Sequence, residues 1–162
     1  MLTIARRMIR KATEHDIPHL LHCIRELARY EHLEHELELD FDRLHAQLFG
    51  NAVACGALIA EDEGKPVGYA LYFAAISTFK TRTCLHLEDL FVLDAHRGKG
   101  HGIALLRAVS AEAVRRGCQR LQWNVLDWNE PAIRFYRSQG AVLLSDWRTC
   151  HLAGAALNQL AT

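Results

Sequence analysis

The first third of the chain carries apolar residues at every third or fourth position, separated by polar and charged ones. This spacing runs from Ile17 to Tyr30 and predicts one amphipathic helix. Thr13 and Asp16 stand just before it, three residues apart, as the members of a capping box do. A second helix is predicted over residues 40–49, so this part of the chain is expected to be mainly helical.

The middle of the chain changes to patterns typical of strands. A short strand is predicted over residues 7–12, and two β-prone runs around a polar turn with Gly and Pro predict a hairpin over 55–75. Another apolar run predicts a strand over 84–93. Apolar residues then return to helical spacing over 103–116, and Gly117 follows as a helix terminator, so a second amphipathic helix is expected here.

The last part of the chain continues the alternation of strand and helix. Residues 120–127 alternate in polarity as a strand does. Asn129 and Pro131 then stand as the cap and the first turn of a helix that ends before Gly140. A final strand is predicted over 141–152. The whole order predicts a mixed α/β layer without repeats or linkers.

Length and composition limit the domain organisation. A chain of 162 residues, of which 50% are hydrophobic, can bury the core of one domain. We expect a single domain over residues 8–162, preceded by residues 1–7 as a disordered extension. The formal net charge is +0 and both signs are interspersed, so composition favours neither a nucleic-acid nor a membrane partner.

The cysteines and histidines give no metal-ligand pattern. The five cysteines are odd in number and widely spaced, which favours reduced thiols and a cytoplasmic protein. The N-terminal residues include no apolar run of the kind that a secretory signal needs. His15 and His19 have helical i, i+4 spacing, but no further ligands stand at a compatible spacing. No metal is therefore expected.

Three glycines, Gly98, Gly100 and Gly102, stand at alternate positions between a predicted strand and a predicted helix. A helix that begins there presents unpaired N–H groups and the positive end of its dipole, and the absence of Cβ atoms lets an anion approach closely. Arg97 and Lys99 add positive charge. A tight turn that needs positive φ is the alternative interpretation. The spacing matches neither a Walker loop nor a dinucleotide-binding fingerprint.

The loop also contains Arg-x-x-Gly-x-Gly, which resembles the signature with which GNAT-superfamily N-acetyltransferases hold the pyrophosphate of acetyl-coenzyme A. Together with "ELARYE", "LEDLFV", "RGKGHG" and "WNEPAIRFYRSQGA", the chain resembles the diamine (spermidine/spermine) acetyltransferase family and its thialysine-acetylating branch. The resemblance implies the α/β GNAT fold, with a mixed, mostly antiparallel twisted sheet flanked by helices in a single domain. It also implies acetyl-coenzyme A as cosubstrate and a homodimer.

Acetyl transfer to an amine needs a proton acceptor for the amine and a proton donor for the departing thiolate. Glu88 could accept the proton directly or through water, and in the resembled family the matching glutamate binds substrate. Tyr136 matches that family's acid tyrosine, and a phenol with a pKa of about 10 can protonate a thiolate. The structural alternatives are an exposed strand carboxylate for Glu88 and a core aromatic beside Phe135 for Tyr136.

The resemblance implies two sets of site residues. On the cofactor side they are Leu90, Phe91, Val92, Arg97, Gly98, Lys99, Gly100, His101, Gly102, Ile103, Asn129, Glu130, Pro131, Ala132 and Tyr136. On the substrate side they are Tyr30, Glu31, Glu88, Gln122, Trp123 and Asn124. Polyamine enzymes of the family carry acidic residues before the last-strand tryptophan, whereas this chain reads "LLSDWR" with Asp146 alone. This departure favours a shorter diamine, thialysine or another lysine-like amine.

Two classes of function remain at this point. The favoured one is an acetyl-coenzyme A dependent N-acetyltransferase that acts on a small diamine, a polyamine or a lysine-like amine by direct transfer in a ternary complex. Within the enzyme class, a protein lysine or N-terminus, or an antibiotic amine, is the alternative substrate. Outside it, the alternative is a non-catalytic acyl-coenzyme A sensor, which the presence of both Glu88 and Tyr136 disfavours.

Overall fold

The computed structural model describes residues 8–162, which divide into two compact units between Asn124 and Val125. Residues 1–7, predicted as an extension, lie outside the described residues. The first unit contains strands β1 (Met8–Lys11), β2 (Gly56–Asp62), β3 (Lys65–Ser77), β4 (Arg82–Val92) and β5 (Leu121–Gln122). Its helices are α1 (Ile17–Glu31), α2 (Phe41–Phe49) and α3 (His101–Arg115), with short 3-10 turns η1 (Glu14–Asp16), η2 (Glu34–Glu36) and η3 (Asp94–His96).

The five strands form one mixed sheet in the order β1-β2-β3-β4-β5, as the predicted α/β class requires. The first three pairs are antiparallel, whereas β4 and β5 pair in parallel through only two residue pairs, Leu85 with Leu121 and His86 with Gln122. The strand predicted over 120–127 is therefore too long. Alternating polarity beyond Gln122 was not sufficient, because a strand also needs a neighbouring chain to pair with its backbone.

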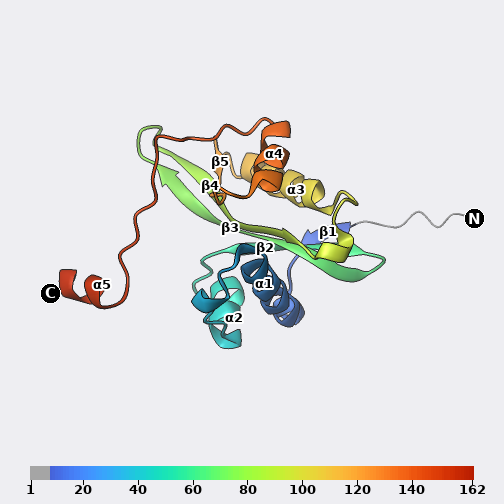
Figure 1. Ribbon diagram of the computed structural model, residues 1–162, viewed down its shortest axis with the longest axis horizontal. Helices are drawn as coiled ribbons and strands as arrows, with labels where there is room; N and C mark the ends of the chain where they lie inside the picture. The colour runs from blue at the N-terminus through green and yellow to red at the C-terminus, as the bar shows by residue number, and fades with distance from the viewer. Residues whose placement is uncertain (1–7) are drawn as a thin grey trace, which may run out of the picture. The chain divides into compact units, whose positions relative to one another are not determined.

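Both faces of the sheet are covered by helices. Helices α1 and α2 lie on one face and α3 lies on the other (Figure 1). On the first face, α1 and α2 bury apolar side chains against β2, β3 and β4. The core there consists of Ile17, Leu20, Cys23, Leu48, Ala57, Ile59, Tyr69, Leu71 and Phe91. Since β4 is held from both faces, the loop that follows it starts from a fixed position.

The start of α1 is anchored by a partly buried ion network. Asp16 closes the predicted capping box with Thr13, whose backbone N–H donates to the Asp16 carboxylate at 2.7 Å. Arg10 on β1 donates two hydrogen bonds to the same carboxylate, at 2.7 and 2.8 Å, and a third to Glu61 on β2 at 2.7 Å. The Arg10 guanidinium is the main reason why the pKa of Asp16 is lowered to about 2. The network joins β1, β2 and α1.

The second unit contains α4 (Glu130–Ser138) and α5 (Gly154–Leu160). The predicted cap of α4 is confirmed, because the Asn129 side chain accepts a hydrogen bond from the Ala132 N–H at 3.3 Å. The strand predicted over 141–152 is wrong: these residues form no strand and lead to α5. Val142 and Trp147 are 81% and 76% exposed, so these apolar residues do not pack into a core as the residues of a buried strand would.

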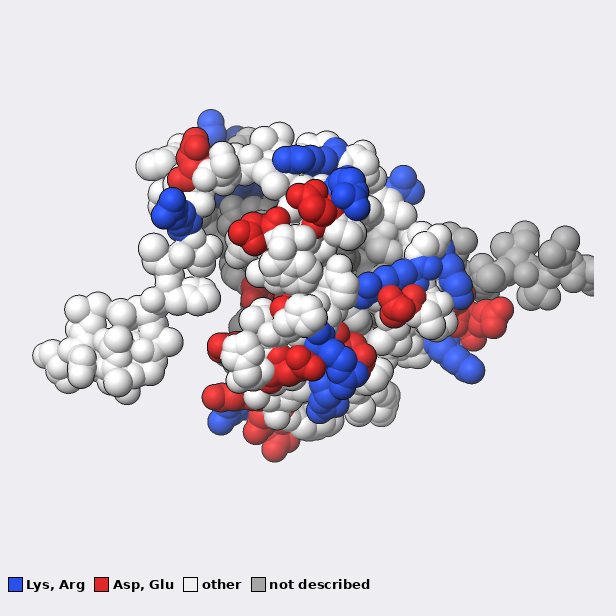
Figure 2. Space-filling model, viewed as in Figure 1, with Lys and Arg blue, Asp and Glu red and all other residues white. Residues whose placement is uncertain are grey.

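The surface carries charges of both signs, except along the C-terminal segment. Acidic and basic side chains intermingle on the face shown in Figure 2, and neither sign covers it. Residues 149–162, which include α5, contain no Lys, Arg, Asp or Glu.

Within residues 8–162, every helix is too short or too polar to cross a membrane.

Candidate functional site

A bulge in β4 exposes the carboxylate predicted as a proton acceptor. The register with β3 pairs Leu71 with Asp89 and then Tyr72 with Leu87, so Glu88 is an extra residue without an opposite partner. Bulges of this kind redirect side chains and are frequent beside active sites. The Glu88 side chain is 55% exposed, in agreement with an accessible acid.

The edge of β4 that faces away from β3 is open where the glycine loop begins. Among the described strands, only β5 pairs with this edge, and its pairing ends at His86. Leu90, Phe91 and Val92 therefore follow on a strand whose second edge has no strand partner. Such an edge can pair with the amides of an extended ligand, which agrees with the cofactor-side assignment that the resemblance implies for this stretch.

Histidine 86 links two predicted substrate-side residues and was not predicted itself. Its Nε2 lies 3.6 Å from the Glu88 carboxylate, and its Nδ1 lies 3.5 Å from the side-chain amide nitrogen of Gln122 on β5. The imidazole stacks on Phe73 with ring centroids 4.8 Å apart. The parallel pairing of β4 with β5 thus brings Glu88 and Gln122 close together, and the His86 imidazole lies between them.

A second acidic group, Asp89, lies beside Glu88 and is partly buried. The Tyr69 hydroxyl donates a hydrogen bond to its carboxylate at 2.9 Å. Burial raises the pKa of Asp89 to about 6, and the negative charges of Glu88 and Glu31 add to the increase. Burial also raises the pKa of Glu31 at the end of α1. Glu31, Glu88 and Asp89 therefore form an acidic group suited to a cationic ligand.

The raised pKa of Asp89 predicts an unusual stability effect. A carboxyl whose folded-state pKa exceeds its ordinary value of 3.8 stabilises the fold below that value, and the contribution is lost as pH rises through about 6. The difference between the two pKa values corresponds to a loss of roughly 3 kcal/mol of unfolding free energy at pH 8. Asp89→Asn keeps the acceptor for Tyr69 and removes the charge. We expect its unfolding free energy to exceed that of the wild type by about 2 kcal/mol at pH 8 and to match it near pH 3.

Urea unfolding at pH 3, 6 and 8 measures this difference, and Asp42→Asn on the exposed surface of α2 is the matched control. Equal stabilities of the Asp89 variant and the wild type at all three pH values would contradict a buried, destabilised carboxylate.

The arginine of the loop is held by aromatic side chains. The Arg97 guanidinium carbon lies 4.6 Å from the centroid of the Tyr30 ring and 5.3 Å from that of Phe91. Its Nε donates a hydrogen bond to the Val92 carbonyl at 3.0 Å. Arg97 thus connects the predicted substrate-side Tyr30 with the predicted cofactor-side end of β4, and it contributes positive charge beside the loop.

The glycines of the loop serve two different needs. Gly98 and Gly100 have φ of 73° and 85°, in the left-handed region that glycine adopts most readily. Gly102 is helical, and a Cβ built on it would meet nothing within 4 Å, so neither backbone conformation nor packing requires glycine there. The bare backbone at Gly102 is instead what close approach of a ligand requires.

The first turn of α3 offers donors to that ligand. The first backbone bond of the helix runs from the Ala104 N–H to the Gly100 carbonyl at 3.2 Å. The N–H groups of His101, Gly102 and Ile103 therefore have no acceptor within the helix, and they lie at the positive end of its dipole. The loop thus has the donors and the free space that a pyrophosphate needs.

The side chain of His101 is turned away from this opening. It is only 1% exposed, and neither ring nitrogen has a hydrogen-bond partner among the described residues. An unpaired buried polar group costs about 1–3 kcal/mol. Its Nε2 lies 3.6 Å from the Asp62 carboxylate at the end of β2. His101 can therefore serve the predicted cofactor side through its backbone N–H, while its imidazole lies beside Asp62.

Comparison with known proteins identifies the family. Residues 17–141 match the model of the acetyltransferase (GNAT) family. The chain belongs to this family. As a GNAT enzyme it is an N-acetyltransferase, and acetyl-coenzyme A is the family's cosubstrate.

Individual relatives of this GNAT enzyme cover nearly its whole length. Over 95% of the chain and 96% of the relative, it is 37% identical to a thialysine N-epsilon-acetyltransferase of Bos taurus. It is 35% identical to a human spermidine/spermine N(1)-acetyltransferase-like protein over 89% of the chain, which is 22% of that longer protein. An integron cassette protein structure from V. cholerae superposes with a TM-score of 0.79 at 28% identity, covering 96% of this chain and 97% of that one.

The remaining predicted cofactor-side residues of the GNAT enzyme lie in the second unit, on and just before α4. Asn129 is buried and caps the helix, Pro131 stands in the first turn, and exposed Glu130 pairs with Arg134 at 3.8 Å. Tyr136 is 9% exposed, and its ring centroid lies 5.2 Å from that of Phe135. The Tyr136 ring is therefore well packed, and this packing restricts the direction of its hydroxyl.

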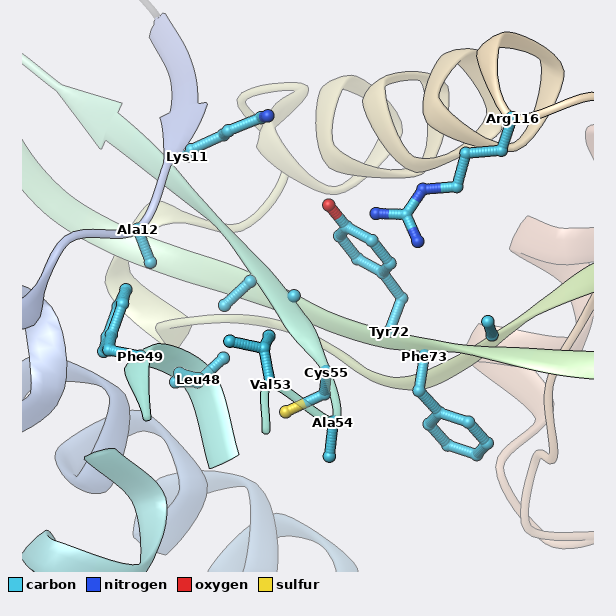
Figure 3. A pocket seen from close by; sticks show the side chains of 13 residues that line it. Lys11, Ala12, Leu48, Phe49, Val53, Ala54, Cys55, Tyr72, Phe73 and Arg116 are labelled. Atoms are coloured by element: carbon cyan, nitrogen blue, oxygen red, sulfur yellow. The ribbon is translucent and has the colours of Figure 1, made fainter. Parts of the chain in front are cut away.

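A cavity of about 340 Å³ lies beside the start of β2 and residues Tyr72–Ala74 of β3, and none of the predicted site residues lines it. It is lined by the ends of β1 and α2, by Tyr72 and Phe73 on β3, and by Arg116 after α3 (Figure 3). The Arg116 guanidinium carbon lies 5.5 Å from the Tyr72 ring centroid. Cys55 also lines it, and burial raises the pKa of this thiol, so it is not an activated nucleophile.

Proposed function

We propose that this GNAT enzyme transfers the acetyl group of acetyl-coenzyme A to a primary amine of a small diamine, a polyamine or a lysine-like molecule. The acidic group of Glu31, Glu88 and Asp89 carries the proposal, because three carboxyls beside the open edge of β4 suit an extended cationic amine. Relatives named for thialysine and for spermidine/spermine support the same substrate class.

The cosubstrate would lie along β4 and the start of α3. The free edge at Leu90–Val92 offers backbone groups to its amides, and the N–H groups of His101, Gly102 and Ile103 offer donors to its pyrophosphate. Lys99 and Arg97 add positive charge. For Asn129, Glu130, Pro131 and Ala132 on the second unit, contact with the cosubstrate is proposed from the family resemblance alone.

The reaction is direct attack of the amine on the thioester carbonyl. Glu88 accepts a proton from the substrate ammonium, directly or through water, and His86 is placed to orient the carboxylate. A nitrogen–carbon bond forms as the carbon–sulfur bond breaks. Tyr136 donates its hydroxyl proton to the departing thiolate, and the second proton that the amine nitrogen loses on becoming an amide restores the tyrosine hydroxyl through solvent. Tyr30, Gln122, Trp123 and Asn124 line the substrate side in this proposal. No covalent enzyme intermediate is needed.

Glu88→Gln tests the proton acceptor. We expect turnover to fall most at neutral and lower pH and to recover partly as pH rises, because more of the amine is then already neutral. Steady-state rates from pH 6 to 10 measure this, with Glu36→Gln on η2, exposed on the surface, as the control. A loss of the same size at every pH would assign Glu88 to positioning instead.

The substrate class is tested by comparing kcat/KM for a panel of amines. Thialysine, ornithine, putrescine and spermidine represent the proposed class, and a lysine peptide, a free N-terminus and an aminoglycoside represent the alternatives. We expect the small dibasic amines to exceed the others by at least about tenfold. Preference for the peptide or the aminoglycoside would contradict the proposal, and release of no thiol with any amine would favour an acyl-coenzyme A sensor.

We also propose that the enzyme is a cytoplasmic homodimer. All five cysteines are free, which suits a reducing compartment. Exposed apolar side chains on the C-terminal segment, among them Val142, Leu144 and Trp147, suit an interface with a second copy. Sedimentation equilibrium should give twice the chain mass of 18.4 kDa, and a monomer at all micromolar concentrations would contradict the dimer.

A further inference from the structure

Three side chains from separate segments converge beneath the glycine loop. Asp62 ends β2, His96 ends η3, and His101 begins α3. His96 Nδ1 lies 3.1 Å from Asp62 Oδ2, and His101 Nε2 lies 3.6 Å from the same oxygen. One ligand atom from each residue falls within 4.8 Å of the other two. The three residues are 34 and 5 positions apart in the chain, so sequence spacing could not indicate the cluster.

We propose that Asp62, His96 and His101 bind a divalent transition-metal ion, with Zn²⁺ as the best match. Two imidazole nitrogens and a carboxylate oxygen are the donor set that zinc and its neighbours take, and hard ions such as Mg²⁺ prefer oxygen alone. Metal–ligand bonds of about 2.0–2.1 Å in tetrahedral geometry put neighbouring ligand atoms about 3.3 Å apart. The separations from Asp62 Oδ2, 3.1 and 3.6 Å, bracket that distance, and all three ligand atoms lie within 4.8 Å of one another.

The unpaired imidazole of His101 is the independent observation that points to a ligand. It is almost completely buried, and neither nitrogen has a hydrogen-bond partner among residues 8–162. Buried histidines are ordinarily paired. A metal ion held between Asp62, His96 and His101 would give Nε2 a partner without moving the backbone. Solvent reaches the site from the side of His96, whose side chain is partly exposed.

Lys99 competes for the same carboxylate. Its Nζ lies 3.5 Å from Asp62 Oδ2, and the side chain is about half exposed, so it can swing into solvent. The hydrogen bond to His96 is the main reason why the pKa of Asp62 is lowered, and the charge of Lys99 adds to this. A metal ion would displace the lysine and cross-link β2, η3 and α3 at the base of the glycine loop.

Metal titration of untagged, EDTA-treated protein tests the site without acetyl-coenzyme A or amine, so the outcome does not depend on the proposed function. We expect calorimetry to show one Zn²⁺ per chain, and Co²⁺ to give visible d–d absorption without thiolate charge-transfer bands. Asp62→Asn and His96→Gln should each weaken binding at least about tenfold. His45→Gln should bind as the wild type does, since His45 also lies beside a carboxylate, that of Glu14 at 3.5 Å.

Lys99→Ala provides a test that a folding defect cannot imitate. Because it removes the cation that competes for Asp62, we expect it to bind Zn²⁺ several-fold more tightly than the wild type. Circular dichroism confirms that each variant is folded before titration. The proposal is overturned if the wild type binds no Zn²⁺ at about 100 μM, if all variants bind equally, or if Co²⁺ spectra show cysteine ligands.

Discussion

Replacing Tyr136 by phenylalanine is expected to slow acetyl transfer by about a hundred- to ten-thousand-fold, with little change in the affinity for acetyl-coenzyme A. The variant keeps the ring, its packing beside Phe135 and the helix around it, and it loses only the hydroxyl. If that hydroxyl donates the proton to the leaving thiolate, chemistry slows and binding persists. Cofactor affinity by calorimetric titration and turnover on the best amine of the panel measure the two effects separately.

Tyr72→Phe is the matched control, because Tyr72 is also buried but lines the separate cavity of Figure 3. Loss of one hydroxyl there should alter stability by about 1 kcal/mol and leave turnover per folded molecule nearly unchanged. Turnover of the Tyr136 variant within a few-fold of the wild type would remove Tyr136 as the acid and assign it to the core of the second unit.

Gly102→Glu is expected to weaken acetyl-coenzyme A binding by about a hundredfold or more without destabilising the fold. The new Cβ meets nothing within 4 Å and the residue is helical, so the backbone tolerates a side chain. A carboxylate in the first turn even favours the helix dipole. The same carboxylate would occupy the space proposed for the pyrophosphate and repel it, which at a few ångströms costs roughly 3 kcal/mol. Calorimetric titration and thermal unfolding measure the two properties.

Two control variants separate charge from bulk. Gly102→Ala adds only a methyl group, and we expect it to stabilise the helix by about 1 kcal/mol with a smaller loss of affinity. Ala111→Glu adds the same charge to an exposed position of α3 far from its start, and affinity should not change. Substitution of Gly100 is less informative, because its φ of 85° strains any other residue. Unchanged affinity of Gly102→Glu would exclude the loop from the cofactor site.

Hydrophobic periodicity and end signals predicted most of the fold. Helices α1 to α4 and strands β1 to β4 appear where the patterns place them, because each buries a regular face and carries its own cap or turn. The strand predicted over 120–127 is too long, and residues 141–152 form no strand. Residues 120–127 alternate in polarity and residues 141–152 begin with an apolar run, but such patterns describe only the side chains, and pairing with a neighbour decides whether a strand forms.

The candidate site was predicted in part, and the omissions have a common cause. Glu88 and the glycine loop are visible as local patterns, whereas the roles of Asp89 and His86 depend on partners far away in the chain, Tyr69 and Gln122. Two consecutive acids in "LEDL" break the alternation of β4 and were the available signal for a bulge. The convergence of Asp62, His96 and His101 leaves no such trace, since three separate segments meet there only in the folded chain.

The central claim is that this GNAT enzyme transfers acetyl directly from acetyl-coenzyme A to a small dibasic amine. A single-turnover experiment with excess enzyme and isotope-labelled acetyl-coenzyme A tests it most directly, with mass spectrometry of both the amine and the protein. We predict no thiol release without amine, and with thialysine one acetylated product per thiol while the protein mass stays unchanged. Thiol release with acetyl retained on the protein, or no acetylated amine even at excess enzyme, would contradict the claim.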